Sequence, residues 1–260
     1  MTKPIKALLI DLSGVLYVGK HLLPGAQAVI EEARKRGLVL RFVTNTATKS
    51  QASILRDLEH FGIQASSNEL FSAPIAAKSY IRSHSLRPFC LIHPALKPDF
   101  DDLDQSDPNC VLLGDARKDL SYDNLNRVFQ LLIEDLPLIA LGMNRYFKAE
   151  GGLMLDAGPF VKALEWATEQ SALVMGKPSK DFYLQVVDST GIPIDQCMMI
   201  GDDVESDVIG AINAGLQGCL VQTGKYLPGD EKKLPNGAKV IQGVNRFFKP
   251  TSDLEDHDAY

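Results

Sequence analysis

Short apolar runs and helical patterns alternate over the first 65 residues. Residues 7–10 are all apolar, which is typical of a strand covered on both faces of a sheet. Residues 26–33 carry apolar side chains at spacings of three and four, and Gly37 follows them, as expected of a helix and its end. A second strand pattern over 38–43 precedes another helical pattern over 54–61. This βαβα opening predicts a parallel sheet.

The alternation becomes less regular from about residue 84 and returns later in the chain. We therefore predict a doubly wound α/β core with a parallel sheet, formed by residues 1–83 and 172–260, and an inserted α/β cap domain, residues 84–171. The strands and helices expected after residue 84 span residues 89–93, 111–113, 122–133, 173–175, 180–189, 198–200, 206–214 and 219–221.

The composition is that of an ordinary folded protein. With 260 residues, of which 45% are hydrophobic, the chain is long enough for one or two cores. Its net charge of −6 and its lack of an arginine-rich stretch argue against nucleic acid as a partner. No run approaches the roughly 18 apolar residues that cross a bilayer, which argues against a membrane span. The first residues lack the apolar segment of a signal peptide, so we expect a cytoplasmic protein.

The four cysteines, Cys90, Cys110, Cys197 and Cys219, are widely separated and lie in or beside apolar stretches. They form no C-x-x-C pair, so a zinc site and disulfides are both disfavoured. We expect buried free thiols.

Polar residues follow directly after the apolar strands of the predicted core. Ligands of a parallel α/β sheet bind outside the carboxyl ends of its strands, so these residues should meet in one cleft. They are Asp11, Thr44, Asn45, Lys177, Asp202 and Asp203. Taken singly, each is more typical of a helix cap, a loop or a turn. Their joint placement at strand ends is what indicates a site.

Together these residue types suit phosphoryl transfer, in which a protein positions a phosphate dianion and neutralises its charge. Asp11 and Asp202 can share a hard cation such as Mg²⁺, which prefers oxygen ligands. Lys177 supplies a compact positive charge, and Thr44 and Asn45 supply hydrogen-bond donors. The sequence therefore predicts a magnesium-dependent phosphoryl site.

Four segments in this order, residues 11–16, 44–45, 176–178 and 201–207, resemble the motifs of the haloacid dehalogenase superfamily of phosphohydrolases. The long insertion between the second and the third resembles the large α/β cap of its NagD-like branch. The resemblance implies that Asp11 is a nucleophile that forms an aspartyl phosphate. It also implies a homodimer that pairs through the cap.

The resemblance gives roles to the other residues of the site. It implies that Asp11, Asp202 and the backbone carbonyl of Ser13 bind Mg²⁺. The residues expected around the phosphoryl group are Asp11, Leu12, Ser13, Thr44, Asn45 and Lys177. Asp203 and Asp207 would support the metal indirectly, by orienting its waters or Lys177. Capping of the following helix is an equal alternative for both.

Ser13 departs from the wider superfamily, in which most phosphatases carry an aspartate here as general acid and base. A hydroxyl is a poor proton donor, so leaving groups that need little protonation should be preferred. Inorganic pyrophosphate and the P–N bonds of phospholysine- and phosphohistidine-type substrates have such leaving groups. The segments that resemble members of this branch acting on these compounds are residues 11–17, 91–93, 106–111, 152–156 and 223–225.

Two other functions stay open. A sugar- or nucleotide-phosphate phosphatase of the NagD-like type would use the same site on other leaving groups. A regulatory protein would bind Mg²⁺ and a phosphate ligand but turn over slowly because of Ser13. We expect the substrate to be a small phosphorylated molecule, or a phosphoprotein only if the cap leaves an open entrance.

Three further residues or segments carry weaker signals. His93 ends a predicted strand, and no role is assigned to it. Residues 144–146 follow an apolar run, and either contact with a leaving group or a solvated loop would explain them. Trp166 has apolar neighbours at helical spacing, so we expect it to pack in a core.

Overall fold

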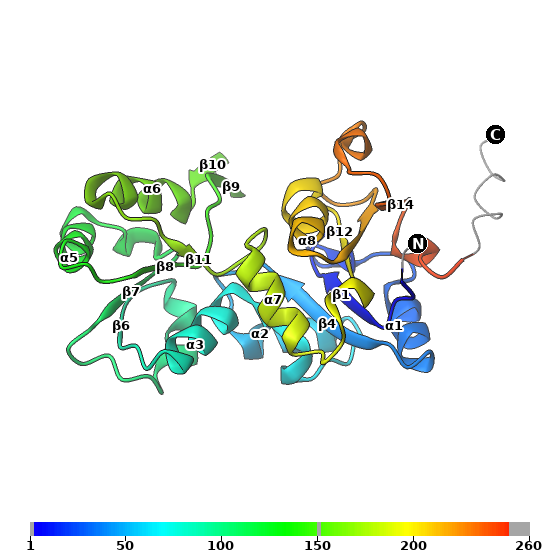
Figure 1. Ribbon diagram of the computed structural model, residues 1–260, viewed down its shortest axis with the longest axis horizontal. Coiled ribbons are helices and arrows are strands. Elements are labelled where there is room, and N and C mark those ends of the chain that lie inside the picture. The colour runs from blue at the N-terminus through cyan, green and yellow to red at the C-terminus, as the bar shows by residue number, and fades with distance from the viewer. Residues whose placement is uncertain (1–2, 150–151, 250–260) are drawn as a thin grey trace. The chain divides into compact units, whose positions relative to one another are not determined.

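The computed structural model describes residues 3–149 and 152–249 and shows two compact units (Figure 1). The first unit consists of Met1–Val43, Leu58–Ala65 and Val186–Tyr260. The second consists of Thr44–Asp57 and Ser66–Gln185. Each unit has its own parallel sheet and is described in turn.

The sheet of the first unit has its strands in the order β14-β13-β12-β1-β4, all parallel. These strands are β1 (Ala7–Asp11), β4 (Val39–Thr44), β12 (Cys197–Gly201), β13 (Gln217–Val221) and β14 (Lys239–Ile241). Every residue of β1 and β12 is buried, which explains why both strands are almost entirely apolar in sequence. The other elements of this unit are β2 (Tyr17–Val18), β3 (His21–Leu22), α1 (Ala26–Lys35), the π-helix η5 (Val204–Ile209) and α8 (Gly210–Ala214).

Helices α1 and α8 lie on opposite faces of this sheet (Figure 1). The connection from β1 to β4 and that from β12 to β13 run in opposite directions along the sheet. Right-handed crossovers therefore put their helices on opposite faces. Strand order thus reverses between the neighbours β1 and β12, which is where doubly wound sheets bind their ligands.

The larger sheet of the second unit has the order β11-β8-β7-β6 and is also parallel. Its strands are β6 (Pro88–Leu91), β7 (Cys110–Leu113), β8 (Leu138–Ala140) and β11 (Leu173–Val174). The other elements of this unit are β5 (Leu70–Ser72), α3 (Ala73–Ser83), α4 (Lys97–Phe100), α5 (Tyr122–Leu132), the hairpin strands β9 (Tyr146–Ala149) and β10 (Gly152–Leu155), and α6 (Ala157–Thr168). Helices α2 (Gln51–His60) and α7 (Lys180–Asp188) each belong in part to both units.

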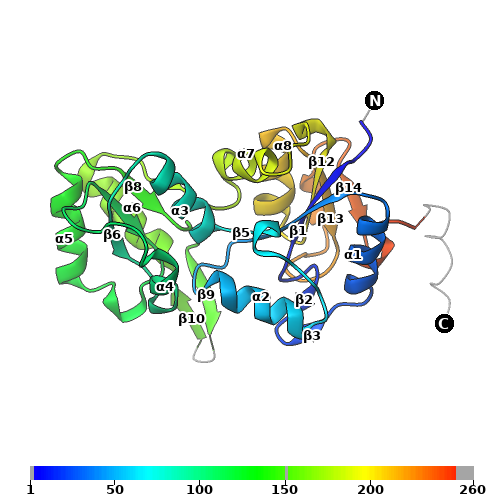
Figure 2. The same cartoon turned by 90° about the horizontal axis from the view of Figure 1, so that it is seen from below.

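Helices α5 and α6 cover one face of this second sheet, and α3 lies on its other side (Figure 2). Val128 of α5 and Val161 and Leu164 of α6 are buried in the same cluster as Val111 of β7. Trp166 is 86% exposed, so the expectation that it packs in a core is wrong. It lies two residues after Leu164, about 200° further round the helix, and therefore points away from the sheet.

The strand expected at residues 173–175 does not belong to the sheet of the first unit, so that prediction is wrong. β11 pairs with β8 through Leu173 opposite Ile139 and Val174 opposite Ala140. A short apolar run indicates a strand but carries no information about which sheet it joins. The first unit resumes only at Val186.

The two units have different limits from the expected domains. Residues 44–57, 66–83 and 172–185, all expected in the core, belong to the second unit. The assignment of 1–83 and 172–260 to a catalytic core, and of 84–171 to a cap, stays a prediction about function.

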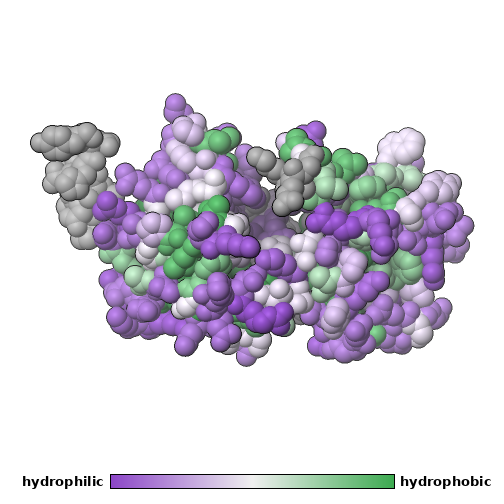
Figure 3. Space-filling view, turned by 180° about the vertical axis from the view of Figure 1, so that it is seen from behind, coloured by the Kyte–Doolittle hydropathy of each residue, from purple (hydrophilic) through white to green (hydrophobic). Residues whose placement is uncertain are grey.

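The surface is mostly hydrophilic on the face drawn in Figure 3, with apolar residues in small groups. Within residues 3–149 and 152–249, no helix combines the length and apolar character of a bilayer span. Cys110, Cys197 and Cys219 are buried and Cys90 is half-buried, and all four are free thiols, as expected. The cytoplasmic location stays a prediction.

Candidate functional site

Three buried carboxylates gather at the strand-order reversal of the first sheet. Asp11 ends β1, Asp202 follows β12, and Asp207 lies in η5. Their exposed fractions are 7%, 2% and 1%. One oxygen of each lies within 4.8 Å of the others, so the three can hold one cation together. Carboxylate oxygens are the ligands that Mg²⁺ prefers, and three such charges are tolerated in an interior when a cation neutralises them.

Asp202 is held by two neighbouring loops. Its Oδ2 accepts a hydrogen bond of 2.7 Å from the backbone N–H of Lys225. On the other side lies Gly14, which has a φ of +92°, and a Cβ there would stand 1.9 Å from Asp202 Oδ2. Thr223 Oγ1 donates to the Gly14 carbonyl at 2.5 Å and fixes one loop to the other. The carboxylate therefore fits only because residue 14 has no side chain and has a left-handed backbone.

Asp207 reaches the cluster because η5 begins with a π-helical turn rather than the regular helix expected from residue 206. Such turns shift the side chains of a helix relative to their regular positions and are frequent at functional sites. Gly201 lies against Asp207, where a Cβ would stand 2.2 Å from the Asp207 Cβ. Asp207 Oδ2 also accepts from the Asp203 N–H at 3.1 Å. Asp207 is thus placed as a candidate metal ligand, a more direct role than the indirect support expected from the sequence.

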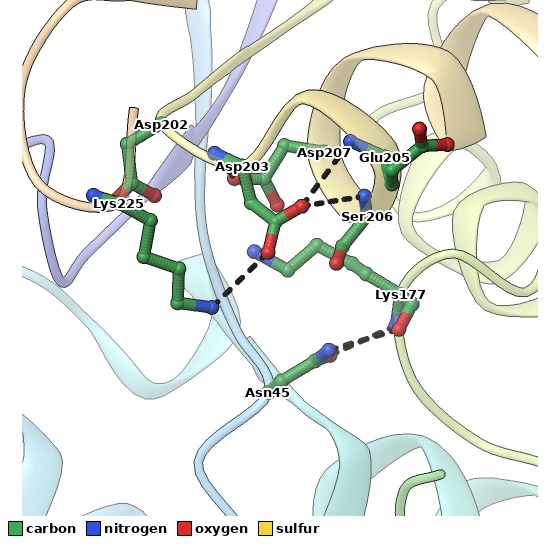
Figure 4. Close-up of polar contacts among 8 residues, drawn as sticks. All are labelled: Asn45, Lys177, Asp202, Asp203, Glu205, Ser206, Asp207 and Lys225. Atoms are coloured by element: carbon green, nitrogen blue, oxygen red, sulfur yellow. Dashed lines mark hydrogen bonds and ion pairs between the residues drawn. The ribbon is translucent and has the colours of Figure 1, made fainter. Parts of the chain in front are cut away.

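Asp203 caps the helix and pairs with a lysine (Figure 4). Its Oδ1 accepts from the backbone N–H groups of Glu205 and Ser206, at 3.2 and 2.9 Å. Its Oδ2 lies 3.2 Å from Lys225 Nζ. Burial raises the pKa of Asp203, but the Ser206 hydrogen bond and the Lys225 charge outweigh it, so the pKa lies below its usual value. The capping alternative is confirmed for Asp203.

Leu12 and Ser13 follow Asp11 in the turn that leads to the hairpin β2-β3. Leu12 is buried, whereas Ser13 is exposed. The backbone of Gly14 closes the turn by donating to the Tyr17 carbonyl at 2.7 Å. Ser13 thus carries an exposed hydroxyl, and its place as a weak substitute for a general acid stays a prediction.

Three of the residues expected around the phosphoryl group, Thr44, Asn45 and Lys177, lie in the second unit, where Asn45 and Lys177 are joined. Asn45 Nδ2 donates to the Lys177 carbonyl, and Asn45 Oδ1 accepts from the Lys177 N–H, both at 2.8 Å (Figure 4). Lys177 is 6% exposed. This pair of bonds fixes the Lys177 backbone, so the Asn45 amide acts first as a positioning group. The preceding Thr44 makes two hydrogen bonds with Thr46. Its Oγ1 donates to Thr46 Oγ1 at 2.9 Å and accepts from the Thr46 N–H at 3.1 Å.

Two features of the site had no clear sequence signal. Lys225 and Thr223 stand out in the sequence only as part of a resembling segment. The contact of Lys225 with Asp202 spans 23 residues, and that of Thr223 with Gly14 spans 209. The Asn45–Lys177 pairing spans 132 residues. Residues 144–146 are exposed, and a role for them on a leaving group stays a prediction.

Comparison with known sequences gives the family. A family model described as haloacid dehalogenase-like hydrolase matches residues 8–105, and one described as HAD-hydrolase-like matches residues 174–246. Haloacid dehalogenase-like hydrolase domain-containing protein 2 of Bos taurus is 42% identical over 232 residues, 89% of this chain and 90% of that protein. The phospholysine phosphohistidine inorganic pyrophosphate phosphatase of Homo sapiens is 40% identical over 233 residues, 87% of this chain and 86% of that protein.

Comparison with solved structures gives the same fold. A 4-nitrophenylphosphatase of Thermotoga maritima superposes with a TM-score of 0.83 at 25% identity, covering 93% of this chain and 95% of that chain. The predicted fold class and the predicted family resemblance are both confirmed. The chain belongs to the haloacid dehalogenase-like hydrolase family of enzymes.

Proposed function

We propose that this enzyme is a Mg²⁺-dependent phosphatase that works through a phosphorylated Asp11 and favours inorganic pyrophosphate or P–N substrates of the phospholysine and phosphohistidine type. The observation that carries the proposal is the buried cluster of Asp11, Asp202 and Asp207 at the reversal of strand order. Relatives named as phosphatases of pyrophosphate and P–N compounds support the substrate class.

The donor set of the cluster fits Mg²⁺. All three groups are carboxylates, and the Asp202 oxygen between Gly14 and Lys225 is held in one orientation. Asp11, Asp202 and Asp207 would hold the ion. The family resemblance implies the Ser13 backbone carbonyl as a further ligand. When bound, Mg²⁺ neutralises charge on the phosphoryl oxygens and polarises the phosphorus for attack.

Asp11, the last residue of β1, is the proposed nucleophile because it holds that position in the first of the resembling motifs, whereas Asp202 Oδ2 is held by the Lys225 N–H. In the proposed reaction an Asp11 oxygen attacks phosphorus in line, and the bond from phosphorus to the leaving group breaks. A water molecule then attacks the phosphorus of the aspartyl phosphate, releasing phosphate and restoring the Asp11 carboxylate.

Chain continuity supports a common target for Asp11 and the phosphate-binding residues. Val43 lies opposite Asp11 in the first sheet, and Thr44 is the next residue of the same strand. Asn45 follows and fixes the backbone of Lys177. We propose that Lys177, Thr44 and the Asn45 backbone stabilise charge on the equatorial phosphoryl oxygens.

Ser13 determines the preferred leaving group in this proposal. A general acid is typically worth about 10²–10⁴-fold in rate, or about 3–5 kcal/mol of barrier. An exposed serine hydroxyl cannot supply that proton. Phosphate leaving from pyrophosphate, or a protonated nitrogen leaving from a P–N bond, needs little from an acid, whereas a sugar alkoxide needs much.

The homodimer through the cap is part of the proposal. The hairpin strand β10 exposes three apolar side chains, Leu153, Met154 and Leu155, at 69%, 50% and 61%. Exposed apolar groups of this kind favour a protein partner. Sedimentation velocity of the purified chain should give a dimer, and a monomer at all concentrations tested would remove this part.

Phosphate release from the purified enzyme with Mg²⁺ tests the proposal. The panel is pyrophosphate, imidodiphosphate, phospholysine, glucose 6-phosphate and a nucleoside monophosphate, with Asp11→Asn as control. Release from pyrophosphate or the P–N compounds that vanishes in Asp11→Asn is the expected result. Faster release from glucose 6-phosphate or the nucleotide would make the enzyme a sugar- or nucleotide-phosphate phosphatase. Binding of the panel compounds without release would make it a regulatory protein.

A further inference from the structure

The carboxyl ends of the second sheet also carry polar residues. His93 follows β6, Asp115 and Arg117 follow β7, and Lys177 follows β11. All the strands are parallel, so these residues lie along one edge of one sheet. This is the edge at which parallel α/β sheets bind ligands. The phosphoryl chemistry of Asp11 does not use His93, Asp115 or Arg117.

Arg117 is held in one position from three sides. Its Nε pairs with Asp115 Oδ2 at 3.2 Å, and its backbone N–H donates to Asp115 Oδ1, also at 3.2 Å. Its guanidinium carbon lies 4.4 Å from the ring centroid of Phe147 in the hairpin strand β9. Its φ is +55°, a left-handed conformation that a residue with a side chain adopts only when its surroundings require it.

The arrangement leaves the outer edge of the guanidinium available for a ligand. Asp115 is 5% exposed and is occupied by Arg117 on both oxygens. The Arg117 side chain is 36% exposed, and within the part of the chain that the structure describes no acceptor pairs with its Nη groups. A buried carboxylate on Nε and an aromatic ring on the flat face preorganise an arginine for two-point binding of a phosphate or carboxylate.

His93 adds a second donor at the same edge. Its Nδ1 accepts from the Ala95 N–H at 3.2 Å, so in the neutral ring the proton lies on Nε2. Burial and then the Arg117 charge lower the pKa of His93, Asp115 raises it, and the net shift is downward. At neutral pH the ring therefore offers an N–H donor.

We propose that Arg117, with His93, forms an oxyanion subsite that binds the anionic leaving group of the substrate. Lys177 follows an edge strand of this sheet and Arg117 follows β7, two strands away, which is about 10 Å at ordinary strand spacing. A phosphoryl group at Lys177 thus leaves room for a second anionic group toward Arg117. The assignment rests on the proposed function for its link to catalysis, but not for binding of the anion itself.

A structural role for Arg117 makes a different prediction. If Arg117 only ties the hairpin to the loop after β7, its loss lowers stability and affects all substrates alike. If it binds a leaving group, its loss affects substrates whose leaving group is already charged in the bound substrate more than substrates whose leaving group is uncharged there.

Arg117→Met is therefore compared on pyrophosphate and on 4-nitrophenyl phosphate, whose leaving group carries no phosphate. The expected result is a loss of kcat/KM on pyrophosphate at least about tenfold larger than on 4-nitrophenyl phosphate, with most of the change in KM. Arg127→Met is the matched control, because Arg127 also stacks on a phenylalanine, Phe89, at 4.6 Å. It should not separate the two substrates. Equal losses on both substrates in Arg117→Met would overturn the subsite.

Binding of inorganic pyrophosphate to the Asp11→Asn enzyme, measured by calorimetry with Mg²⁺, separates this inference from the proposed function. Adding Arg117→Met should weaken that binding about tenfold or more, and Arg117→Lys should restore part of it. If Arg117→Met weakens pyrophosphate binding but the wild-type enzyme releases no phosphate, the subsite is retained and the phosphatase is refuted. Unchanged binding in Arg117→Met would refute the subsite and leave the phosphatase intact.

Discussion

The two parallel sheets of this enzyme carry opposite charges at the carboxyl ends of their strands. The first sheet presents Asp11 and Asp202, with Asp207 from the following helix. The second presents Lys177, Arg117 with its buried partner Asp115, and the neutral His93. Both sheets are parallel, and each gathers side chains from separate segments at one edge. The side chains alone decide that one edge suits a cation and the other an anion.

The two edges also differ in how their groups are held. In the first unit glycines make room, because Gly14 and Gly201 lie where a side chain would displace Asp202 and Asp207. In the second unit side chains hold side chains, as Asp115 and Phe147 hold Arg117. A cation site packs several short carboxylates closely, whereas an anion site needs long donors fixed in direction.

Loss of one carboxylate should have the largest effect and would test whether the first edge is a metal site. Asp202→Asn should lower phosphate release by on the order of 10³-fold and abolish the Mg²⁺-induced rise in melting temperature. Asp230→Asn removes another buried aspartate of the same unit and should keep both signals. An undiminished Mg²⁺ shift in Asp202→Asn would show that the cluster does not bind the ion.

A side chain at position 14 should come next in size and tests the role of the close approach. Gly14→Ala puts a Cβ 1.9 Å from Asp202 Oδ2 at a φ of +92°, so we expect about 1–3 kcal/mol of lost stability and loss of Mg²⁺ binding. Gly19→Ala has a φ of +58° and no atom within 4 Å, so it shares the backbone cost without the clash. Urea unfolding and Mg²⁺ titration of both variants give the comparison. Equal behaviour of the two would mean that the contact with Asp202 is unimportant.

Asn45→Ala tests the corresponding support in the second unit. It leaves the N–H and carbonyl of Lys177 without the Asn45 partners, and an unsatisfied buried group costs about 1–3 kcal/mol. A displaced Lys177 should lower kcat/KM on the order of 10- to 100-fold. Asn124→Ala removes a similar bond, from Asn124 Nδ2 to the Asp119 carbonyl at 2.8 Å, and should change kcat/KM little. A normal kcat/KM in Asn45→Ala would show that Asn45 does not position Lys177 for the reaction.

Lys225 pairs with Asp203, and its removal tests the charge contrast between the edges on a finer scale. Lys225→Met removes a positive charge beside the carboxylates, so Mg²⁺ should bind more tightly. The effect should be small, a two- to fivefold lower Mg²⁺ concentration at half-saturation, because an exposed ion pair is worth only about 0–1 kcal/mol. The melting temperature is followed as Mg²⁺ is added. Lys162→Met, which breaks the exposed pair with Glu165 in the second unit, should leave the titration unchanged. Weaker Mg²⁺ binding in Lys225→Met would give the lysine a positioning role instead.

Thiol reactivity should show the smallest effect and compares the interiors of the two sheets. Burial raises the pKa of Cys219 to about 12 in the first sheet and that of Cys110 to about 11 in the second. Each thiol is therefore protonated at pH 8 in the folded enzyme, and its thiolate fraction rises with pH only towards those values. Iodoacetamide at pH 8 should label both slowly until the enzyme unfolds. Mg²⁺ should slow the labelling of Cys219 more than that of Cys110. Rapid labelling of the folded enzyme would contradict the burial.

Much of the architecture could be predicted from local sequence. The apolar stripe Ala26, Val29, Ile30 and Ala33 predicts α1, and each of these residues is buried. The strands expected near residues 111–113 and 198–200 are found as β7 and β12. Errors occurred where a short segment had a choice of partner. β11 has two residues, and nothing in two residues distinguishes one parallel sheet from another.

Trp166 shows a second limit of local patterns. Apolar residues near it in sequence indicated a core, but the helix turns it away from the face that holds Val161 and Leu164. A helical stripe is defined by its angular spacing, and one large apolar residue outside the stripe is common on protein surfaces.

The sequence by itself determined the residue types at the strand ends, and with them the family and the prediction of a phosphoryl site. These follow from local order along the chain, since a polar residue directly after an apolar strand must lie at the edge of a sheet. Only the tertiary structure decided which neighbours complete each edge. Lys225 beside Asp202, Asn45 on the Lys177 backbone and Phe147 against Arg117 are contacts between distant segments. Such contacts depend on how loops pack in three dimensions, and no spacing along the chain encodes them.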